Sequence, residues 1–223
     1  MTTSTQEHTR YPRASATELL RLSPTRLKIV DAAAEAFMER GYDSTSIDEI
    51  AERIGATKGA VYYNYRSKFD IFLAVYERGM LLLEERMVGA MASTSGLRAA
   101  DRLRAVSVGH AENIMRHLKW HLVIQHGVEQ RRQMALKEGD RARLAALDAT
   151  RERHEELVRS LIEEGQVDGS IRPFPARLAT RTLIGGIVGI AIWYRPREEQ
   201  SEDDRLAIAE QVVEMLLTGL LST

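Results

Sequence analysis

The chain lacks cysteine altogether, so it has no disulfide, no thiolate nucleophile and no cysteine-based metal site. It also lacks a long hydrophobic run. The longest apolar stretch, residues 183–194, has about twelve residues, whereas a membrane-spanning helix needs roughly twenty. The first residues are polar, and we expect no signal peptide. These absences favour a cytoplasmic protein with no membrane partner.

A large excess of charge of one sign is missing too, because 31 basic and 32 acidic residues leave a net charge of −1. Any nucleic-acid-binding surface must therefore be local. One such region exists. Residues 53–69 contain no Asp or Glu but include Arg53, Lys58, Arg66 and Lys68. Phosphate binding benefits from this bias, since each neutralised phosphate releases a counterion.

Motifs of the common enzyme classes are absent. The sequence has no G-x-S-x-G elbow, no H-E-x-x-H pair and no G-x-x-x-x-G-K-[ST] loop. We therefore expect no catalytic residue, no cofactor and no enzymatic activity.

Residues 37–73 are the most informative part of the chain. Ser46 and Glu49 have the form of a capping box, which predicts the start of a short helix. Gly55 suits a sharp turn, and Thr57 can cap a second short helix that ends near Tyr65. Ser67 and Asp70 repeat the capping-box pattern. Two short helices joined by a tight turn indicate a helix-turn-helix unit, whose second helix enters the DNA major groove.

The second short helix supplies the predicted DNA contacts. Tyr62 and Tyr65 share one face and are expected to pack inward, whereas Tyr63 points outward. Gly59 is a poor helix former and suggests close approach of the backbone to a partner. The alternative is an ordinary three-helix bundle with solvated tyrosines. The complete set of candidate DNA-binding residues is Thr45, Thr57, Lys58, Gly59, Tyr62, Tyr63, Asn64 and Lys68.

Residues 25–72 resemble the N-terminal DNA-binding domain of the TetR family of bacterial transcriptional regulators. The run GATKGAVYYNYRSK, residues 55–68, is close to the family's most diagnostic stretch. It departs from the pattern mildly, with Tyr65 in place of Phe and Phe69 in place of an acid. The resemblance implies a homodimer on palindromic double-stranded DNA, a helical C-terminal ligand domain, and repression relieved by a small molecule. The matching residues are Ile29, Ala32, Ala33, Phe37, Gly41, Tyr42, Thr45, Ser46, Ile47, Ile50, Ala51, Gly55, Lys58, Gly59, Val61, Tyr62, Tyr63, Tyr65, Ser67, Lys68 and Phe72.

We predict an all-α fold of about nine helices, because no segment shows sustained period-two alternation. Residues 1–23 are expected to form a flexible arm, which can also reach an adjacent minor groove. Residues 24–70 form the helix-turn-helix domain, and residues 71–223 a ligand-binding and dimerisation bundle. Helices after the DNA-binding domain are predicted at about 68–92, 97–117, 119–137, 139–164, 176–194 and 203–221.

The last two predicted helices carry the expected dimer interface. Three glycines inside an apolar helix each cost about 1 kcal/mol, which close helix–helix contact would explain. The final helix offers an apolar stripe. The alternative is that both helices close the core of one chain. The predicted interface residues are Gly185, Gly186, Gly189, Trp193, Ile208, Val212, Met215 and Leu216.

The effector is predicted from short motifs. WYRP at 193–196 and EEGQVDGSIRP at 163–173 look like a TetR subgroup that responds to acyl-CoA thioesters. An apolar cavity with arginines at its mouth would suit an acyl chain on a phosphorylated carrier. Solvated, ion-paired arginines are the alternative. The candidate ligand-binding residues are Met87, Met91, Met115, Leu147, Arg177 and Arg181.

Two other effectors stay open. His110, His117 and His121 would line one stripe of a continuous helix, which suggests a metal-sensing regulator. No residue is assigned as a metal ligand in the main interpretation, because packed or solvated histidines are common. A drug-responsive regulator of efflux is the second alternative.

Overall fold

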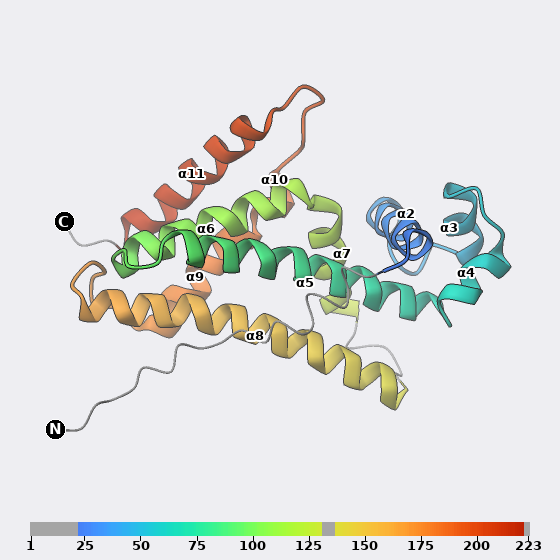
Figure 1. Cartoon of the computed structure of the whole chain (residues 1–223), viewed down its shortest axis with the longest axis horizontal. Coiled ribbons are helices and arrows are strands. Elements are labelled where there is room, and N and C mark those ends of the chain that lie inside the picture. Colours follow the sequence, from blue (N-terminus) through green and yellow to red (C-terminus); the bar gives the residue numbers. More distant parts are fainter. Residues whose placement is uncertain (1–21, 131–136, 221–223) are drawn as a thin grey trace.

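The computed structural model describes residues 22–130 and 137–220, and these residues are almost entirely helical without a β-sheet (Figure 1). The predicted all-α class is confirmed. If α9 and α10, which meet at Gly189, are counted as one interrupted helix, the described residues contain nine helices. The elements are α2 (Pro24–Arg40), α3 (Ile47–Arg53), α4 (Lys58–Asn64), α5 (Lys68–Ser93), α6 (Ala99–Arg116), α7 (Leu118–Gln130), α8 (Glu138–Val167), α9 (Ala176–Val188), α10 (Ile190–Trp193) and α11 (Glu202–Thr218).

Local capping explains where the first helices begin. The hydroxyls of Ser46, Thr57 and Ser67 accept hydrogen bonds from backbone N–H groups three residues later, at 3.1–3.2 Å. The three predicted caps are therefore confirmed. A reciprocal capping box occurs instead at the start of α11, between Ser201 and Asp204. The predicted arm, residues 1–23, lies outside the described residues except for its last two.

The N-terminal domain packs α2, α3 and α4 against the first turns of α5. Ile29, Ile50, Val61 and Tyr65 are almost completely buried there. The two inter-helix turns contain Gly41 and Gly55 with φ of 79° and 64°, a region that side chains with a Cβ rarely enter. The chain therefore folds sharply enough to present α4 at one end of the molecule (Figure 1).

The C-terminal bundle is built around α6, which contacts α5, α8 and α11. The long α5 belongs to both domains, because Phe72 packs in the first core and Met87 in the second. The predicted boundary at residues 70/71 therefore falls inside a continuous helix. The predicted break between two helices at residues 117–119 is confirmed, because α6 ends at Arg116 and α7 begins at Leu118. The condition for a histidine stripe, one continuous helix through His110, His117 and His121, is therefore not met. Residues 131–136, part of the predicted sixth helix, lie outside the described residues.

Candidate DNA interface and effector region

The outer surface of α4 presents aromatic and polar side chains to solvent. Tyr63 is 91% exposed, and Lys58 is exposed beside it. Asn64 is half-buried and donates to the carbonyl of Ala60. A monomeric protein gains nothing from holding a tyrosine ring almost fully in water, whereas a binding surface uses its large, rigid contact area. The position of Tyr63 agrees with the predicted DNA contact.

The other tyrosines of α4 differ from one another. Tyr65 is 1% exposed, and its hydroxyl donates to the backbone carbonyl of Arg26 at 3.5 Å. The expected inward packing of Tyr65 is confirmed. Tyr62 is 47% exposed, so the expectation that it packs inward with Tyr65 is wrong. The two positions are three residues apart, but the helix ends at Asn64 and Tyr65 already has extended backbone angles. Tyr62 thus remains available as a DNA contact.

Gly59 has no internal reason to be glycine. A Cβ atom built on it would meet only the hydroxyl of Thr57, at 3.8 Å, which is an ordinary contact. Thr57 is exposed and its hydroxyl is used to cap α4. The absence of a side chain at Gly59 leaves the α4 backbone open to an external partner, which fits close approach to DNA.

Thr45 corrects the predicted interface. Its side chain is buried, and its hydroxyl lies 2.8 Å from the carbonyl of Gly41 and 3.1 Å from that of Ala36. These contacts tie the start of α3 to the last turn of α2 and to Gly41, which follows it. We therefore remove the Thr45 side chain from the candidate DNA contacts.

Lys68 is the second correction. Its ammonium donates to three backbone carbonyls, those of Tyr42, Asp43 and Thr45, at 2.7–3.1 Å. An ammonium has three hydrogens, so none is left for a phosphate. It also lies 4.5 Å from the centre of the Tyr42 ring, and burial lowers its pKa. Lys68 fastens the α2–α3 turn to the start of α5.

Two of the basic side chains near α4 are ion-paired with acidic residues that lie outside residues 53–69. The Lys58 ammonium lies 2.7 Å from a carboxylate oxygen of Asp48, and Arg53 pairs with Glu39 and Glu49. The Lys58–Asp48 pair is exposed on both sides, and exposed pairs contribute little to stability. The Lys58 ammonium can therefore exchange this partner for a phosphate at small cost.

These contacts predict opposite effects for two lysines. Lys68→Ala should lower the free energy of unfolding by about 1–3 kcal/mol, because three carbonyls, two of them part-buried, lose a charged donor. Lys58→Ala should leave the melting temperature unchanged while weakening DNA binding and reducing the salt slope by about one unit. Thermal unfolding and salt-dependent fluorescence anisotropy on a DNA probe measure both. Equal melting temperatures for the two variants would refute the role given to Lys68.

The predicted apolar ligand contacts are not brought together. Met87 and Met115 are buried in the C-terminal core, and Met91 packs half-buried against it. Leu147 belongs to the other core, with α2, α7 and the first half of α5. The four side chains therefore do not line one cavity, and that expectation is wrong. The long helix α8 contributes to both cores, and its residue Leu147 faces the core that lacks the three methionines.

Arg177 and Arg181 lie one turn apart on α9, and both are exposed. The Arg181 guanidinium is 3.6 Å from a carboxylate oxygen of Glu155 on α8. This weak, exposed ion pair leaves the guanidinium able to bind a phosphate group. The two arginines remain candidate ligand contacts at the surface.

The C-terminal bundle contains a buried polar cluster, of which sequence reasoning found His110 and His121 but missed Ser107, Asn113 and His154. The rings of His110 and His121 lie 6.4 Å apart, and His121 is hydrogen-bonded to Asn113 at 2.8 Å. His154 approaches from α8 and is also buried. Burial lowers the pKa of His110 and His121 to about 3 and that of His154 to about 4, with neighbouring charges as a smaller cause. All three imidazoles are therefore neutral at pH 7.

The metal-sensing alternative finds no support in this geometry. His117 caps the end of α6, so the predicted stripe is broken between His110 and His121. Within residues 22–130 and 137–220, no group of three or more His, Asp or Glu side chains is placed to hold a metal ion.

A surface groove of about 1140 Å³ runs between α5, α6 and α11. Its walls are strongly charged and carry both signs, with Arg86 and Arg104 opposite Glu210 and Glu214. An ion pair between Arg104 and Glu214 joins α6 to α11 across it. Apolar side chains, among them Ala90, Val108 and Met215, also line the groove. The groove is open to solvent rather than enclosed, so we do not assign the buried acyl group of the effector to it.

The three glycines of the α9–α10 region have three different surroundings. A Cβ on Gly186 would lie 2.6 Å from Leu216 of α11 in the same chain, so this glycine serves internal packing. A Cβ on Gly189 would meet the helix's own carbonyl oxygens at 3.2–3.3 Å, where α9 gives way to α10. Gly185 is exposed and faces open space. The predicted interface role of Gly186 and Gly189 is therefore corrected, and only Gly185 keeps it.

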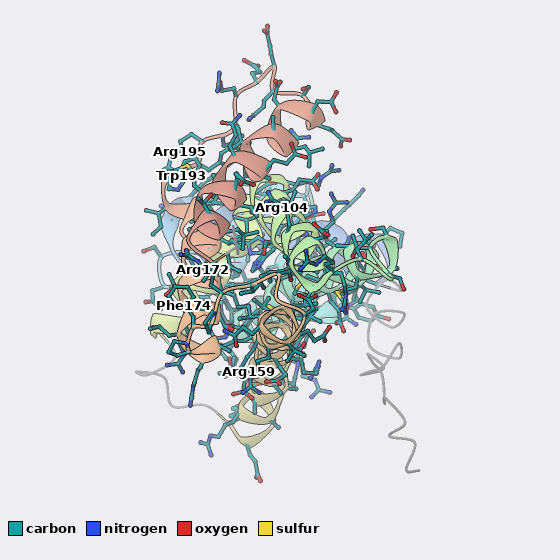
Figure 2. All side chains as sticks on the ribbon, turned by 90° about the vertical axis from the view of Figure 1, so that its left-hand side faces the viewer. Arg104, Arg159, Arg172, Phe174, Trp193 and Arg195 are labelled. Atoms are coloured by element: carbon teal, nitrogen blue, oxygen red, sulfur yellow. The ribbon has the colours of Figure 1, made fainter. Side chains whose placement is uncertain are left out.

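A face of exposed apolar side chains accompanies Gly185. Trp193 and Met215 are largely exposed, and Ile208, Val212 and Leu216 are half-buried. Figure 2 shows Phe174 and Trp193 along the same side of the C-terminal bundle. Residues 176–193 are long and apolar enough to cross a membrane by length and composition only, and 33% of this window is buried within the chain. This exposed apolar surface calls for a covering partner.

Ion pairs connect the two domains. Lys119 of α7 lies 2.8 Å from Glu35 and 3.5 Å from Asp31, both on α2. Arg143 of α8 pairs with Asp70 and Glu77 of α5. These ion pairs join α7 and α8 to the helices against which α4 packs.

The comparisons with known proteins agree with these features. Residues 29–75 match the family described as bacterial regulatory proteins of the tetR family. Residues 96–220, more than half of the chain, match the tetracyclin repressor-like C-terminal domain. The chain belongs to the TetR family of transcriptional regulators, with a helix-turn-helix DNA-binding domain and a C-terminal ligand-binding domain. Regulators of this family bind operator DNA as dimers and respond to small molecules.

Individual relatives narrow the class. The chain is 23% identical over 199 residues to the fatty acid metabolism regulator protein of Bacillus subtilis, covering 88% of this chain and 96% of the relative. The ketosteroid transcriptional regulator KstR2 of Mycobacterium tuberculosis superposes with a TM-score of 0.77 at 19% identity, covering 91% and 98% of the two chains. AibR, solved with isovaleryl coenzyme A and operator DNA, gives 0.70 at 23% identity, covering 86% and 97%. The chain is thus a ligand-responsive regulator related to regulators of fatty acid metabolism, and its relatives are regulators rather than enzymes.

Proposed function

We propose that the protein is a dimeric transcriptional repressor, acting in the cytoplasm, that binds a palindromic operator through α4 and is released by an acyl-CoA thioester. The exposed surface of α4 carries the first half of this proposal. Tyr63 and Lys58 face solvent, and Gly59 leaves the backbone accessible. A twofold dimer would place two copies of α4 in successive major grooves on one side of the duplex.

The thioester is supported by the chemistry of the C-terminal bundle. Its interior offers apolar surface from Met87 and Met115, with neutral polar side chains among them. Arg177 and Arg181 lie outside, on α9, where phosphates remain in water. AibR, a regulator of similar fold, has been solved with isovaleryl coenzyme A. An acyl group inside and a phosphorylated carrier outside match this division.

A binding panel tests the proposed effector class. Purified protein is screened by thermal shift against acyl-CoA thioesters of increasing chain length, steroid-acid thioesters, coenzyme A, free acids, divalent metals and hydrophobic drugs. A ligand that binds only the folded state raises the melting temperature in proportion to its excess over Kd. We expect thioesters to give the largest shifts, and Arg177→Ala with Arg181→Ala to reduce them. If only metals or drugs raised the melting temperature, the thioester would be the wrong effector class.

The dimer proposal makes a prediction about two neighbouring glycines. Gly185→Leu should produce monomers with a normal melting temperature of the bundle, because its side chain enters the partner's space rather than the core. Gly186→Leu should instead lower stability by about 1–3 kcal/mol through overpacking against Leu216. Light scattering and thermal unfolding separate the effects. A Gly185→Leu variant that stays dimeric would move the interface away from this face of α9.

A further inference from the structure

The buried polar cluster of the C-terminal bundle contains atoms without protein partners. Neither ring nitrogen of His154 has a hydrogen-bond partner among the described residues, and the same holds for the hydroxyl of Ser107. His154 is 5% exposed and Ser107 is 1% exposed. Buried polar groups are normally paired, because an unpaired one loses its hydration without compensation. These atoms therefore indicate a place where a ligand supplies the missing partners.

Three helices bring the cluster together. Ser107 and His110 lie three residues apart on α6, so they share a face of that helix. His121 joins from α7, and His154 of α8 lies close enough to His110 to contribute to the lowering of its pKa. The helices α6 and α8 are in contact along the bundle. The polar atoms thus converge from α6, α7 and α8 on one region of the interior.

Two members of the cluster, His121 and Asn113, already have hydrogen-bond partners in the protein. The ring of His121 is bonded to the Asn113 side-chain oxygen, and the Asn113 amide donates to the carbonyl of Leu82 at 3.0 Å. This chain fixes His121 and Asn113 between α5, α6 and α7. His154 and Ser107 have no such hydrogen-bond partners, so their polar atoms remain available to a ligand.

We propose that His154 and Ser107 bind an uncharged oxygen of the effector, such as a thioester carbonyl or a hydroxyl. This inference rests on the proposed function in placing an effector in the bundle, and it specifies the chemistry of that effector. A neutral imidazole offers one donor and one acceptor, and a hydroxyl offers both. A neutral oxygen pairs with either at no cost in buried charge, whereas a carboxylate or an ammonium would bring an uncompensated charge into the interior.

The surroundings agree with a thioester in this position. Met87 and Met115 lie in the core that also contains Val158, one turn after His154 on α8. They can pack against an acyl chain. On the outer side of α8, Glu155 follows His154 directly and pairs with Arg181. A ligand whose carbonyl reached His154 would have Arg181 near the outside of the same turn. The cluster therefore recognises the uncharged junction between the acyl chain and its carrier.

Matched eight-carbon probes test this chemistry. 1-Octanol, octanoate, octylammonium and octanoyl-CoA share one chain and differ only in the head group. Calorimetry at pH 7 should show octanol and octanoyl-CoA binding to the wild type at least tenfold more tightly than octanoate and octylammonium. A preference for a charged probe, or no binding by any probe, would overturn the inference.

Variants assign the binding to the cluster. His154→Leu should weaken octanol and octanoyl-CoA about tenfold, with an unchanged or higher melting temperature, because it removes an unpartnered polar group. His121→Leu is the matched control and should lower the melting temperature, since Asn113 loses its partner. Ser107→Ala provides a second variant should His154→Leu fail to fold, and it should also weaken octanol. Wild-type affinity in Ser107→Ala or His154→Leu would refute the site.

The same titrations separate this inference from the proposed function. If octanol depends on His154 but neither octanoyl-CoA nor other thioesters bind, the site stands and the thioester effector falls. If octanoyl-CoA binds equally to the wild type and to His154→Leu, the effector class stands and the assigned site falls.

Discussion

Replacing Gly59 by alanine is expected to reduce affinity for the operator by at least about tenfold while the free energy of unfolding stays the same or rises by up to about 1 kcal/mol. The gain in stability follows from the helix propensity of alanine, since the added Cβ meets only Thr57 at 3.8 Å. The loss of affinity follows from the new methyl group on the surface that approaches DNA. Few substitutions combine greater stability with lost function, so the result identifies a contact surface.

The chain offers a matched control for this experiment. Gly89 lies in the interior of α5, is exposed, and has nothing within 4 Å of its Cβ position. Gly89→Ala should give a comparable gain in stability without any change in operator affinity. Fluorescence anisotropy on a palindromic DNA, selected with the purified protein from random sequences, measures the affinities. Unchanged affinity in Gly59→Ala would place the DNA contact elsewhere on the domain.

Mild acid is expected to destabilise the protein strongly, by about 5 kcal/mol between pH 6.5 and pH 5. The reason is that His110, His121 and His154 are buried and neutral, with pKa values of about 3, 3 and 4 in the folded chain. In the unfolded chain the same groups take up protons below pH 6.5, their ordinary pKa.

The sign follows from proton binding. Between pH 6.5 and about pH 4 the unfolded state holds more protons than the folded state, so stability falls as pH falls. Each histidine contributes about 1.4 kcal/mol per pH unit in this range. Carboxylates with depressed pKa values, such as Asp168 at about 2, add their effect only at lower pH. The loss of stability between pH 6.5 and pH 5 is therefore due to the histidines.

Urea unfolding at a series of pH values measures this dependence. The slope in the wild type should correspond to about three protons, and His154→Leu should reduce it by about one. His117 is only partly buried, but its pKa is also lowered to about 4, mainly by burial and then by Arg116 and Arg78, so it adds up to one further proton to the slope. A free energy of unfolding that stays constant from pH 6.5 to pH 5 would show that the three histidines are accessible to water or paired.

The DNA-binding domain was predictable because its signals are local. Ser46, Thr57 and Ser67 cap helices whose N–H groups lie three residues away, so the sequence contains the whole interaction. Gly55 adopts the positive φ that its turn demands. The recognition helix could therefore be delimited almost to the residue.

Thr45 and Lys68 were assigned wrongly because the fold, and not the local sequence, decides what their side chains meet. Thr45 turns back onto the carbonyls of Ala36 and Gly41, and the partners of Lys68 are also distant in sequence. The direction of a basic side chain depends on what the fold places beside it, and here the α2–α3 turn lies over the start of α5. Lys68 then meets carbonyls more than 20 residues away. Composition shows that a charge is present, but not whether backbone carbonyls already occupy its hydrogens.

The effector region was predicted least well, for the same reason. Helical periodicity shows that Leu147 faces a core but not which of the two cores it joins. His154 carries no motif, and its proximity to His110 depends on the packing of α8 against α6. Gly186 could not be separated from Gly185 by sequence, because both occupy an apolar helix and only the position of Leu216 distinguishes them.

Regulation by the effector requires communication between the bundle and α4, for which the ion pairs of Lys119 and Arg143 offer a route. His121 lies two residues from Lys119 on α7, so a ligand at the proposed site would contact the helix that is ion-paired to α2. A ligand can shift an equilibrium only by its difference in affinity for the two states. Coupling energies of this kind correspond to roughly 5–150-fold changes in affinity.

The most direct test of the account is the affinity of the purified dimer for its selected operator, measured by fluorescence anisotropy with and without a saturating acyl-CoA thioester. We expect the thioester to weaken operator binding about tenfold or more and coenzyme A alone to have no effect. A thioester that binds the protein, as judged by its melting temperature, yet leaves operator affinity unchanged or increases it would contradict release of a repressor by this class of effector.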